Sequence, residues 1–270
     1  MNRMKTIRIV GRWLGVTFMA ACVGLTGVGC TSSGNTEEEQ QQQLAAGDSV
    51  CYVLKERNME CKLYAVQPEE RLRLAVGEWM DDQLGGYYPG DATDLRTLVD
   101  FYGKSISDTL RNELKELPEG VITEFDMRME KVYESDKVVT YSMLQYYNLG
   151  GAHPSSAALA ATFRKSDGRR LTWDILRQRL AYDFNDVLKE HLYNYFNVKT
   201  DNELKEMLMC VDNLYFIPLP KTPPFFMENG VGFIYQQYEI AAYAMGMPTD
   251  TIPYERIKPF MTEWAKRLIP

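Results

Sequence analysis

Histidine is scarce in this chain, with two among 270 residues, which excludes a His-rich metal site and the H-E-x-x-H zinc motif. The G-x-S-x-G turn that carries a hydrolase serine is absent as well. Gly103-Lys104-Ser105 resembles the end of a phosphate-binding loop, but Leu98 stands where that loop needs glycine, and the tripeptide falls inside a predicted helix. We therefore expect no metal and no cofactor.

Positive charge is the second shortage. Lys and Arg total 30 against 37 for Asp and Glu, which gives a net charge of −7. Four of the basic residues and none of the acidic ones precede residue 30, so a chain that starts at Cys30 would carry −11. Such a chain repels nucleic acid, whose affinity for proteins comes mainly from clustered Lys and Arg, and we expect no nucleic-acid partner.

The first 29 residues have the three parts of a secretory signal: a basic head, an uncharged apolar run over residues 13–29, and small residues at its end. The ending Thr26-Gly27-Val28-Gly29-Cys30 resembles a bacterial lipobox, whose cysteine becomes diacylated and N-terminal. The alternative is a retained signal anchor, although 17 uncharged residues only reach the lower limit for spanning a bilayer. We expect a signal peptide over residues 1–29, a lipid on Cys30 and a place in the cell envelope, at the outer membrane or the cell surface.

Residues 30–48 are expected to form a disordered tether. This segment holds three successive glutamates and four successive glutamines but no Lys, Arg or aromatic residue. Such a composition cannot bury enough apolar surface to order itself.

The remaining cysteines of the mature chain are Cys51, Cys61 and Cys210. Disulfides persist in exported proteins, and a predicted hairpin at Glu56-Arg57-Asn58 lies between Cys51 and Cys61. We expect these two cysteines to pair and Cys210 to remain a buried thiol.

Apolar periodicity predicts an α+β fold of antiparallel sheets with helices packed on one face. Helical spacing runs over residues 72–84 and 95–117, and then alternation with a period of two predicts strands over 125–129 and 139–147. After Gly150 the expected elements are strands at 159–163, 213–219, 225–227 and 231–235 and helices at 184–195, 202–209 and 257–268. We expect two sequential subdomains, 49–149 and 150–270.

Two segments have an unusual composition for their position. Residues 146–154 place two glycines, a histidine and a proline directly after a strand, and residues 238–246 place tyrosine and glutamate among small residues. Glycine permits positive φ, while His, Glu and Tyr form hydrogen bonds, so the segments form either a buried polar lock or a binding surface. His191, on an apolar helical face, is expected to be a core or boundary residue. The candidate binding residues are Tyr146, Gly150, Gly151, His153, Tyr238, Glu239 and Tyr243.

These segments also carry a resemblance to a known family. Gly150-Gly151-Ala152-His153, the stretch over residues 169–176, the Asn229-Gly230 pair and residues 238–246 resemble the extracellular domain of RsiV-type anti-sigma factors and the related PdaC/SigV-like domains. The match is clear over residues 120–268, with Ala242 where the family usually has proline. The resemblance implies an α+β fold and, in RsiV-type members, binding of lysozyme as a signal of cell-wall attack.

Three function classes follow from these observations. The first is an envelope lipoprotein that acts as a stand-alone binding module for a lysozyme-like muramidase or a cell-wall glycan. The second is a structural or assembly lipoprotein of the envelope. The third is a glycan hydrolase that uses His153 with Glu239.

Overall fold

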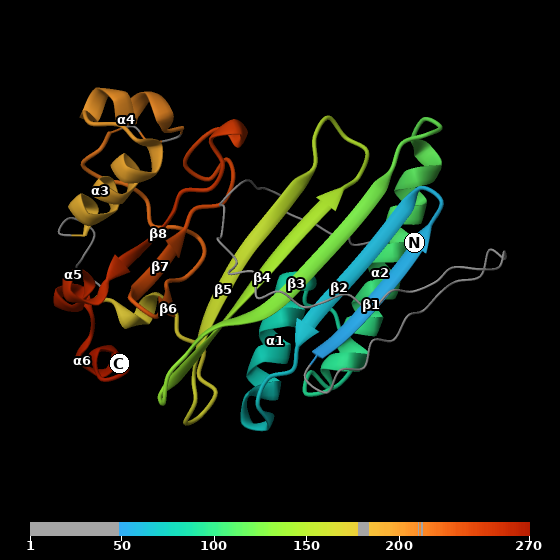
Figure 1. Cartoon of the computed structure of the whole chain (residues 1–270), viewed down its shortest axis with the longest axis horizontal. Coiled ribbons are helices and arrows are strands. Elements are labelled where there is room, and N and C mark those ends of the chain that lie inside the picture. The colour runs from blue at the N-terminus through green and yellow to red at the C-terminus, as the bar shows by residue number, and fades with distance from the viewer. Residues whose placement is uncertain (1–48, 178–183, 210, 212) are drawn as a thin grey trace, which may run out of the picture.

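The computed structural model describes residues 49–177, 184–209, 211 and 213–270 (Figure 1). The expected signal peptide, Cys30, the tether and Cys210 lie outside the described residues. Within the described ranges, the helices are all too short or too polar to cross a bilayer.

Five long strands form the first sheet, in the order β1-β2-β3-β4-β5. Neighbouring strands are antiparallel except β2 and β3, which are parallel because two helices connect them. Both helices, α1 and α2, cover the same face of this sheet (Figure 1). The bounds are β1 Ser49–Glu56, β2 Met59–Val66, α1 Arg73–Leu84, α2 Leu95–Glu116, β3 Thr123–Glu134, β4 Val138–Asn148 and β5 Ser155–Arg164.

Local sequence explains where these two helices begin and end. Helix α1 ends where Gly85 adopts φ 133°, a conformation that glycine adopts without strain. Helix α2 begins after Asp94, whose carboxylate accepts a hydrogen bond from the backbone N–H of Thr97. Tyr102 of α2 is completely buried, and its hydroxyl links the two helices by donating a hydrogen bond to the Asp81 carboxylate on α1. The predictions of both helices and of the strand pair that follows them are confirmed.

A smaller three-stranded sheet with the four helices α3 to α6 makes up the rest of the described fold. Its strands are antiparallel in the order β6-β7-β8, and the turn before Gly230 joins the first two as the sequence predicts. The predicted helices α3 and α4 are confirmed, and α3 packs on this sheet through an apolar face. The bounds are α3 Asn185–Phe196, α4 Asp201–Met207, β6 Phe225–Met227, β7 Gly230–Ile234, β8 Thr249–Pro253, α5 Tyr254–Ile257 and α6 Glu263–Lys266, with single 3₁₀ turns at Glu70–Leu72, Trp173–Ile175, Tyr243–Met245 and Lys258–Phe260.

A buried trio of hydrogen bonds fixes the small sheet against the large one. Thr140 on β4 and Thr162 on β5 are direct partners in the strand register, and both are fully buried. Their hydroxyl oxygens lie 2.8 Å apart; Thr140 donates to the carbonyl oxygen of Phe226 at 2.7 Å, and Thr162 accepts from the Phe226 N–H at 2.7 Å. The two threonines thus satisfy both backbone polar groups of one β6 residue, which we call the threonine clamp.

Three sequence-based expectations need adjustment, although the α+β class is confirmed. No strand forms over residues 213–219, because the backbone there bonds to the Asn185 side chain rather than to another strand. The prediction of a single closing helix over residues 257–268 is wrong, because Pro259 and the extended backbone of Met261 divide this segment into short helices. The division expected between residues 149 and 150 falls in the loop between β4 and β5, so the first sheet draws strands from both expected subdomains.

The prediction of a disulfide between Cys51 and Cys61 is wrong, because both cysteines are free thiols. The hairpin turn consists of Arg57 and Asn58, so Cys51 pairs with Tyr64 and Cys61 with Leu54. Because side chains alternate between faces, this register places Cys61 in the core and Cys51 on the opposite face. Burial raises the pKa of the Cys61 thiol to about 12.

We expect unequal reactivity from these two cysteines. In the folded protein at neutral pH, an alkylating reagent should modify Cys51 and leave Cys61 unmodified, because the thiolate is the nucleophile and burial suppresses it at Cys61. Mass spectrometry of labelled peptides before and after denaturation measures the difference. A peptide pair linked through Cys51 and Cys61 under non-reducing conditions would contradict the register.

Gly103 on α2 supplies a second prediction. A Cβ at this position would lie 2.3 Å from Cγ of the buried Tyr52 ring, so alanine forces the helix and β1 apart. Gly103→Ala should lower the free energy of unfolding by about 1–3 kcal/mol, the usual cost of overpacking a core. The control is Gly151→Ala, where a Cβ meets nothing within 4 Å. Denaturant titration measures the free energy of unfolding of both variants. Equal values for Gly103→Ala and Gly151→Ala would refute the close packing of Gly103 against Tyr52.

Candidate functional site

The structure brings the two unusual segments together. The loop between β4 and β5 carries His153, and the loop between β7 and β8 carries Tyr238 and Tyr243 (Figure 1). The His153 and Tyr243 rings lie 4.0 Å apart between centroids, and the Tyr238 and Tyr243 rings 5.8 Å apart. The Tyr243 hydroxyl donates a 2.8 Å hydrogen bond to the carbonyl oxygen of Pro154. We call His153, Tyr238 and Tyr243 the aromatic cluster.

His153 and Tyr238 are the exposed members of the cluster, and their side chains contact each other and the neighbouring backbone. His153 Nδ1 lies 2.9 Å from the Pro154 carbonyl oxygen, and its Nε2 lies 3.5 Å from the Tyr238 hydroxyl. Tyr238 is 38% exposed and adopts φ 57°, a left-handed conformation that is uncommon for a bulky residue. The partly exposed Tyr238 ring lies beside the Tyr243 ring.

Tyr146 lies on β4 near the cluster, and Gly150 lies in the loop that follows this strand. Tyr146 is half-buried, and burial first and then the nearby Glu124 and Tyr243 raise the pKa of its hydroxyl. Gly150 adopts φ 75°, its N–H donates to Asn148 at 3.0 Å, and a Cβ there would lie 2.4 Å from Leu117. Gly150 is therefore a structural requirement of the turn, whereas the neighbouring Gly151 is exposed with open space around its Cα.

Glu239 has a structural role. One carboxylate oxygen accepts a hydrogen bond from the Lys221 N–H at 2.5 Å, and the other accepts from the Gln236 N–H at 2.7 Å. The contacts of His153 are with Pro154, Tyr238 and Tyr243. The structure therefore does not join His153 and Glu239 into an acid–base pair, and Glu239 instead fixes two loop segments to each other.

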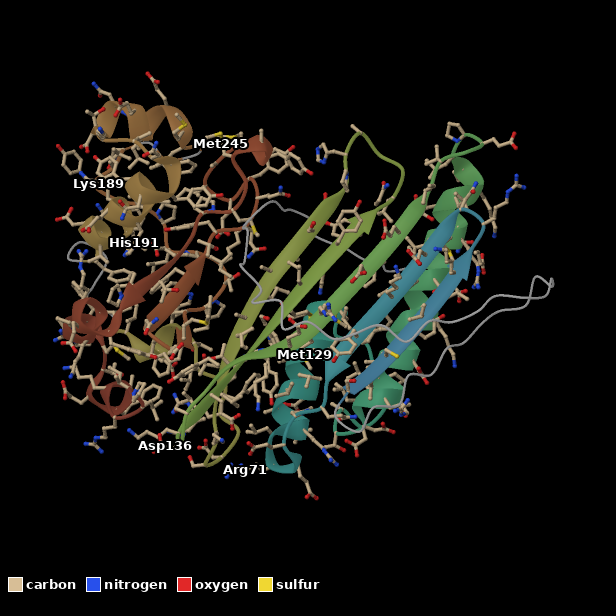
Figure 2. The ribbon with its side chains drawn as sticks, viewed as in Figure 1. Arg71, Met129, Asp136, Lys189, His191 and Met245 are labelled. Atoms are coloured by element: carbon tan, nitrogen blue, oxygen red, sulfur yellow. The ribbon has the colours of Figure 1, made fainter. Side chains whose placement is uncertain are left out.

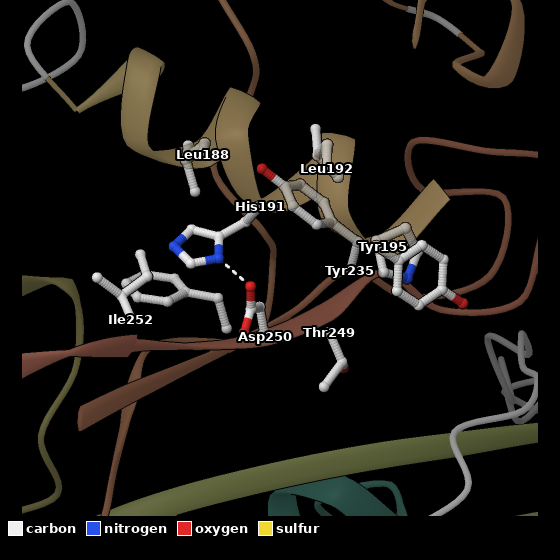
Figure 3. Close-up of a pocket in the computed structure, with 10 residues that line it drawn as sticks. Leu188, His191, Leu192, Tyr195, Tyr235, Thr249, Asp250 and Ile252 are labelled. Atoms are coloured by element: carbon white, nitrogen blue, oxygen red, sulfur yellow. Dashed lines mark hydrogen bonds and ion pairs between the residues drawn. The ribbon is translucent and has the colours of Figure 1, made fainter. Parts of the chain in front are cut away.

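A second pairing of polar side chains was not expected from the sequence. His191 of α3 (Figure 2) forms a hydrogen bond through Nδ1 to the carboxylate of Asp250 on β8 (Figure 3). His191 Nε2 is buried and has no hydrogen-bond partner among the described residues. The prediction of His191 as a core or boundary residue agrees with its 12% side-chain exposure, but no sequence signal pointed to Asp250.

The cavity beside this pair is small and apolar. Leucine, isoleucine, phenylalanine and tyrosine side chains line most of it (Figure 3). Its volume of about 20 Å³ is about that of one water molecule and is too small for an organic ligand. Across the described parts of the chain, no three His, Cys, Asp or Glu side chains gather as they would around a metal ion.

Comparison with known proteins agrees with this fold. Residues 174–255 match the model of a family described as "Protein of unknown function (DUF3298)", and no curated protein matches the chain. A solved DUF3298 family member from Bacteroides fragilis NCTC 9343 is similar at a TM-score of 0.60 and 17% identity, over 76% of this chain and 84% of that one. A DUF3298 family protein from Pseudomonas aeruginosa PAO1 is similar at a TM-score of 0.57 and 14% identity, over 87% and 98%. The chain thus shares the fold of DUF3298 proteins and carries a match to that family over residues 174–255.

Proposed function

We propose that this protein is an exported, lipid-anchored binding module of the cell envelope that captures a basic, lysozyme-like muramidase through the aromatic cluster. The observation that carries this proposal is the exposed Tyr238, held in a left-handed conformation beside Tyr243 and His153. A non-glycine residue at positive φ costs free energy, and such residues concentrate at functional sites. A packing role alone would not require this outward position of the ring.

The chemistry of the cluster suits protein recognition. Tyrosine offers a large, rigid contact area with a polar tip, and aromatic anchors supply much of the binding free energy at protein interfaces. The ring contacts and the hydrogen bond of Tyr243 to Pro154 fix the cluster before a partner arrives. Little side-chain freedom is therefore lost on binding.

Charge supports a basic partner. The chain carries a net charge of −7, and cleavage before Cys30 would lower it to −11. Opposite net charges raise the association rate of two proteins and make that rate depend on salt. The resemblance to RsiV-type extracellular domains, in which lysozyme is the partner, supports the same choice.

A structural role is the second candidate. It is favoured by Glu239, whose two oxygens fix neighbouring loops, and by the bond from Tyr243 to Pro154, which joins loops of the two sheets. In this alternative the whole cluster is a lock between the sheets. A cell-wall glycan is the other partner that exposed aromatic rings would suit.

Truncation of the exposed cluster residues separates these alternatives. Tyr238→Ala and His153→Ala should each weaken capture of a purified lysozyme-type muramidase, with a loss of about 2 kcal/mol, roughly 30-fold in Kd, for a central tyrosine anchor. Both variants should keep the wild-type melting temperature, since both side chains are exposed. Surface plasmon resonance at two salt concentrations measures the effect.

Two controls accompany this experiment. Tyr87→Ala removes a tyrosine of similar exposure, 40%, from the loop between α1 and α2, and should leave Kd unchanged. Glu239→Ala should lower stability by about 1–3 kcal/mol, because two N–H groups lose their acceptor. If the His153 and Tyr238 variants behave like Glu239→Ala, the cluster is a lock; if wild type binds glycan fragments but no muramidase, the partner is wrong.

The anchor has its own test. Cys30→Ser should abolish lipidation and shift the protein from the membrane fraction to the soluble fraction or leave it unprocessed, since a diacyl anchor gains about 0.8 kcal/mol per buried methylene. Fractionation followed by immunoblotting measures the distribution. Equal membrane recovery and unchanged processing of the variant would rule out lipidation at this cysteine.

A further inference from the structure

One loop beside the small sheet exposes aromatic and aliphatic side chains to solvent. Tyr215 is 83% exposed, Phe216 54% and Leu219 44%. We call residues 213–221, which contain them, the Tyr215 loop. Residues 213–227 include no acidic residue and a single basic one, Lys221, although charged residues make up 25% of the chain. The loop is therefore an exposed apolar segment with little charge on an acidic protein.

A single buried amide holds the tip of this loop. Asn185, at the start of α3, donates to the Leu214 carbonyl oxygen at 2.8 Å and accepts from the Ile217 N–H at 2.7 Å. Leu214 and Ile217 are buried, so the two residues between them, Tyr215 and Phe216, project outward. The exposure of these rings is thus fixed by the fold.

Further contacts secure both ends of the loop. The Asn213 side chain accepts from the Tyr215 N–H at 3.0 Å, and the Tyr235 hydroxyl donates to the Pro218 carbonyl oxygen at 2.8 Å. The Lys221 N–H donates to Glu239. A loop held in this way loses little conformational freedom when it binds, so its apolar contacts contribute fully to affinity.

We propose that the Tyr215 loop docks on the surface of a lipid bilayer, with the Tyr215 and Phe216 rings inserted at the headgroup level. Aromatic side chains favour this interface, where an apolar body and a polar tip both find suitable surroundings. The absence of carboxylates from residues 213–227 removes the repulsion and desolvation that the acidic remainder of the chain would meet there.

This proposal rests on the lipid anchor in the proposed function. The expected tether of residues 31–48 reaches at most roughly 60 Å when fully extended, so the folded part stays close to the bilayer. Tethering of this kind gives a weak second contact a high effective concentration. Two aromatic rings are then enough to orient the protein, although they would not hold an untethered protein on a membrane.

The experiment places a fluorescent reporter in the loop of the lipidated protein. Phe216→Trp is compared with Leu144→Trp on β4, because the two native side chains are almost equally exposed, at 54% and 53%. Both variants are reconstituted through Cys30 into phosphatidylcholine–phosphatidylethanolamine vesicles, with and without brominated lipid. The wild-type signal corrects for the native tryptophans.

We expect brominated lipid to lower the Phe216→Trp emission about twofold, since interfacial apolar groups lie roughly 5–10 Å below the headgroup boundary. The Leu144→Trp emission should not change, and acrylamide should quench only this control. High salt should leave the result unchanged, unlike capture of a basic partner.

Other outcomes overturn the docking. Equal acrylamide quenching of both reporters means that the loop faces solvent, even if the protein remains anchored. A reporter at residue 216 that is protected from both lipid and acrylamide means that a protein partner or a second copy covers the loop. Recovery of the protein without its lipid would instead refute the anchor, and the Cys30→Ser fractionation identifies that case separately.

Discussion

The threonine clamp is the constraint on which the arrangement of the two sheets depends. Thr140 and Thr162 are direct cross-strand partners in the large sheet, and together they satisfy the N–H and the carbonyl of Phe226 in the small one. Each buried hydrogen bond contributes about 1 kcal/mol net, but a buried group left without its partner costs about 1–3 kcal/mol. The small sheet is therefore fixed in one position by the cost of moving away from it. That position sets the β7–β8 loop against the β4–β5 loop and so assembles the aromatic cluster.

Two polar side chains, the amide of Asn185 and the carboxylate of Glu239, fix loops beside the small sheet. Asn185 holds both ends of a turn that exposes two aromatic rings, and Glu239 joins the end of the same loop to the segment that carries Tyr238. Both anchors satisfy backbone groups that no strand or helix satisfies. The aromatic cluster and the Tyr215 loop are consequently linked through Glu239, although we assign them to different partners, a basic protein and a bilayer.

Much of the fold and part of the candidate site could be predicted from the sequence. Apolar periodicity located both large helices and the strands β3, β4 and β5, and the expected hairpin near Arg57 corresponds to β1 and β2. The association of residues 146–154 with 238–246 is visible in the contacts of His153 and Tyr243. The sequence could not assign separate roles to the candidate binding residues. Glu239 and His153 are equally polar residue types, and only their contacts distinguish a loop anchor from an exposed surface group.

The sequence by itself determined most of the helices and strands and which of their side chains face the core, because these features follow from periods of 3.6 and 2 residues along the chain. The strand expected over residues 213–219 and the single closing helix are the exceptions, and tertiary contacts decided both. The tertiary structure alone decided how segments meet. A two-residue turn set the register that separates Cys51 from Cys61, and the pairing of His191 with Asp250 joins residues 59 positions apart. Register and long-range pairing depend on turn length and on packing between distant elements, which leave no local period in the sequence.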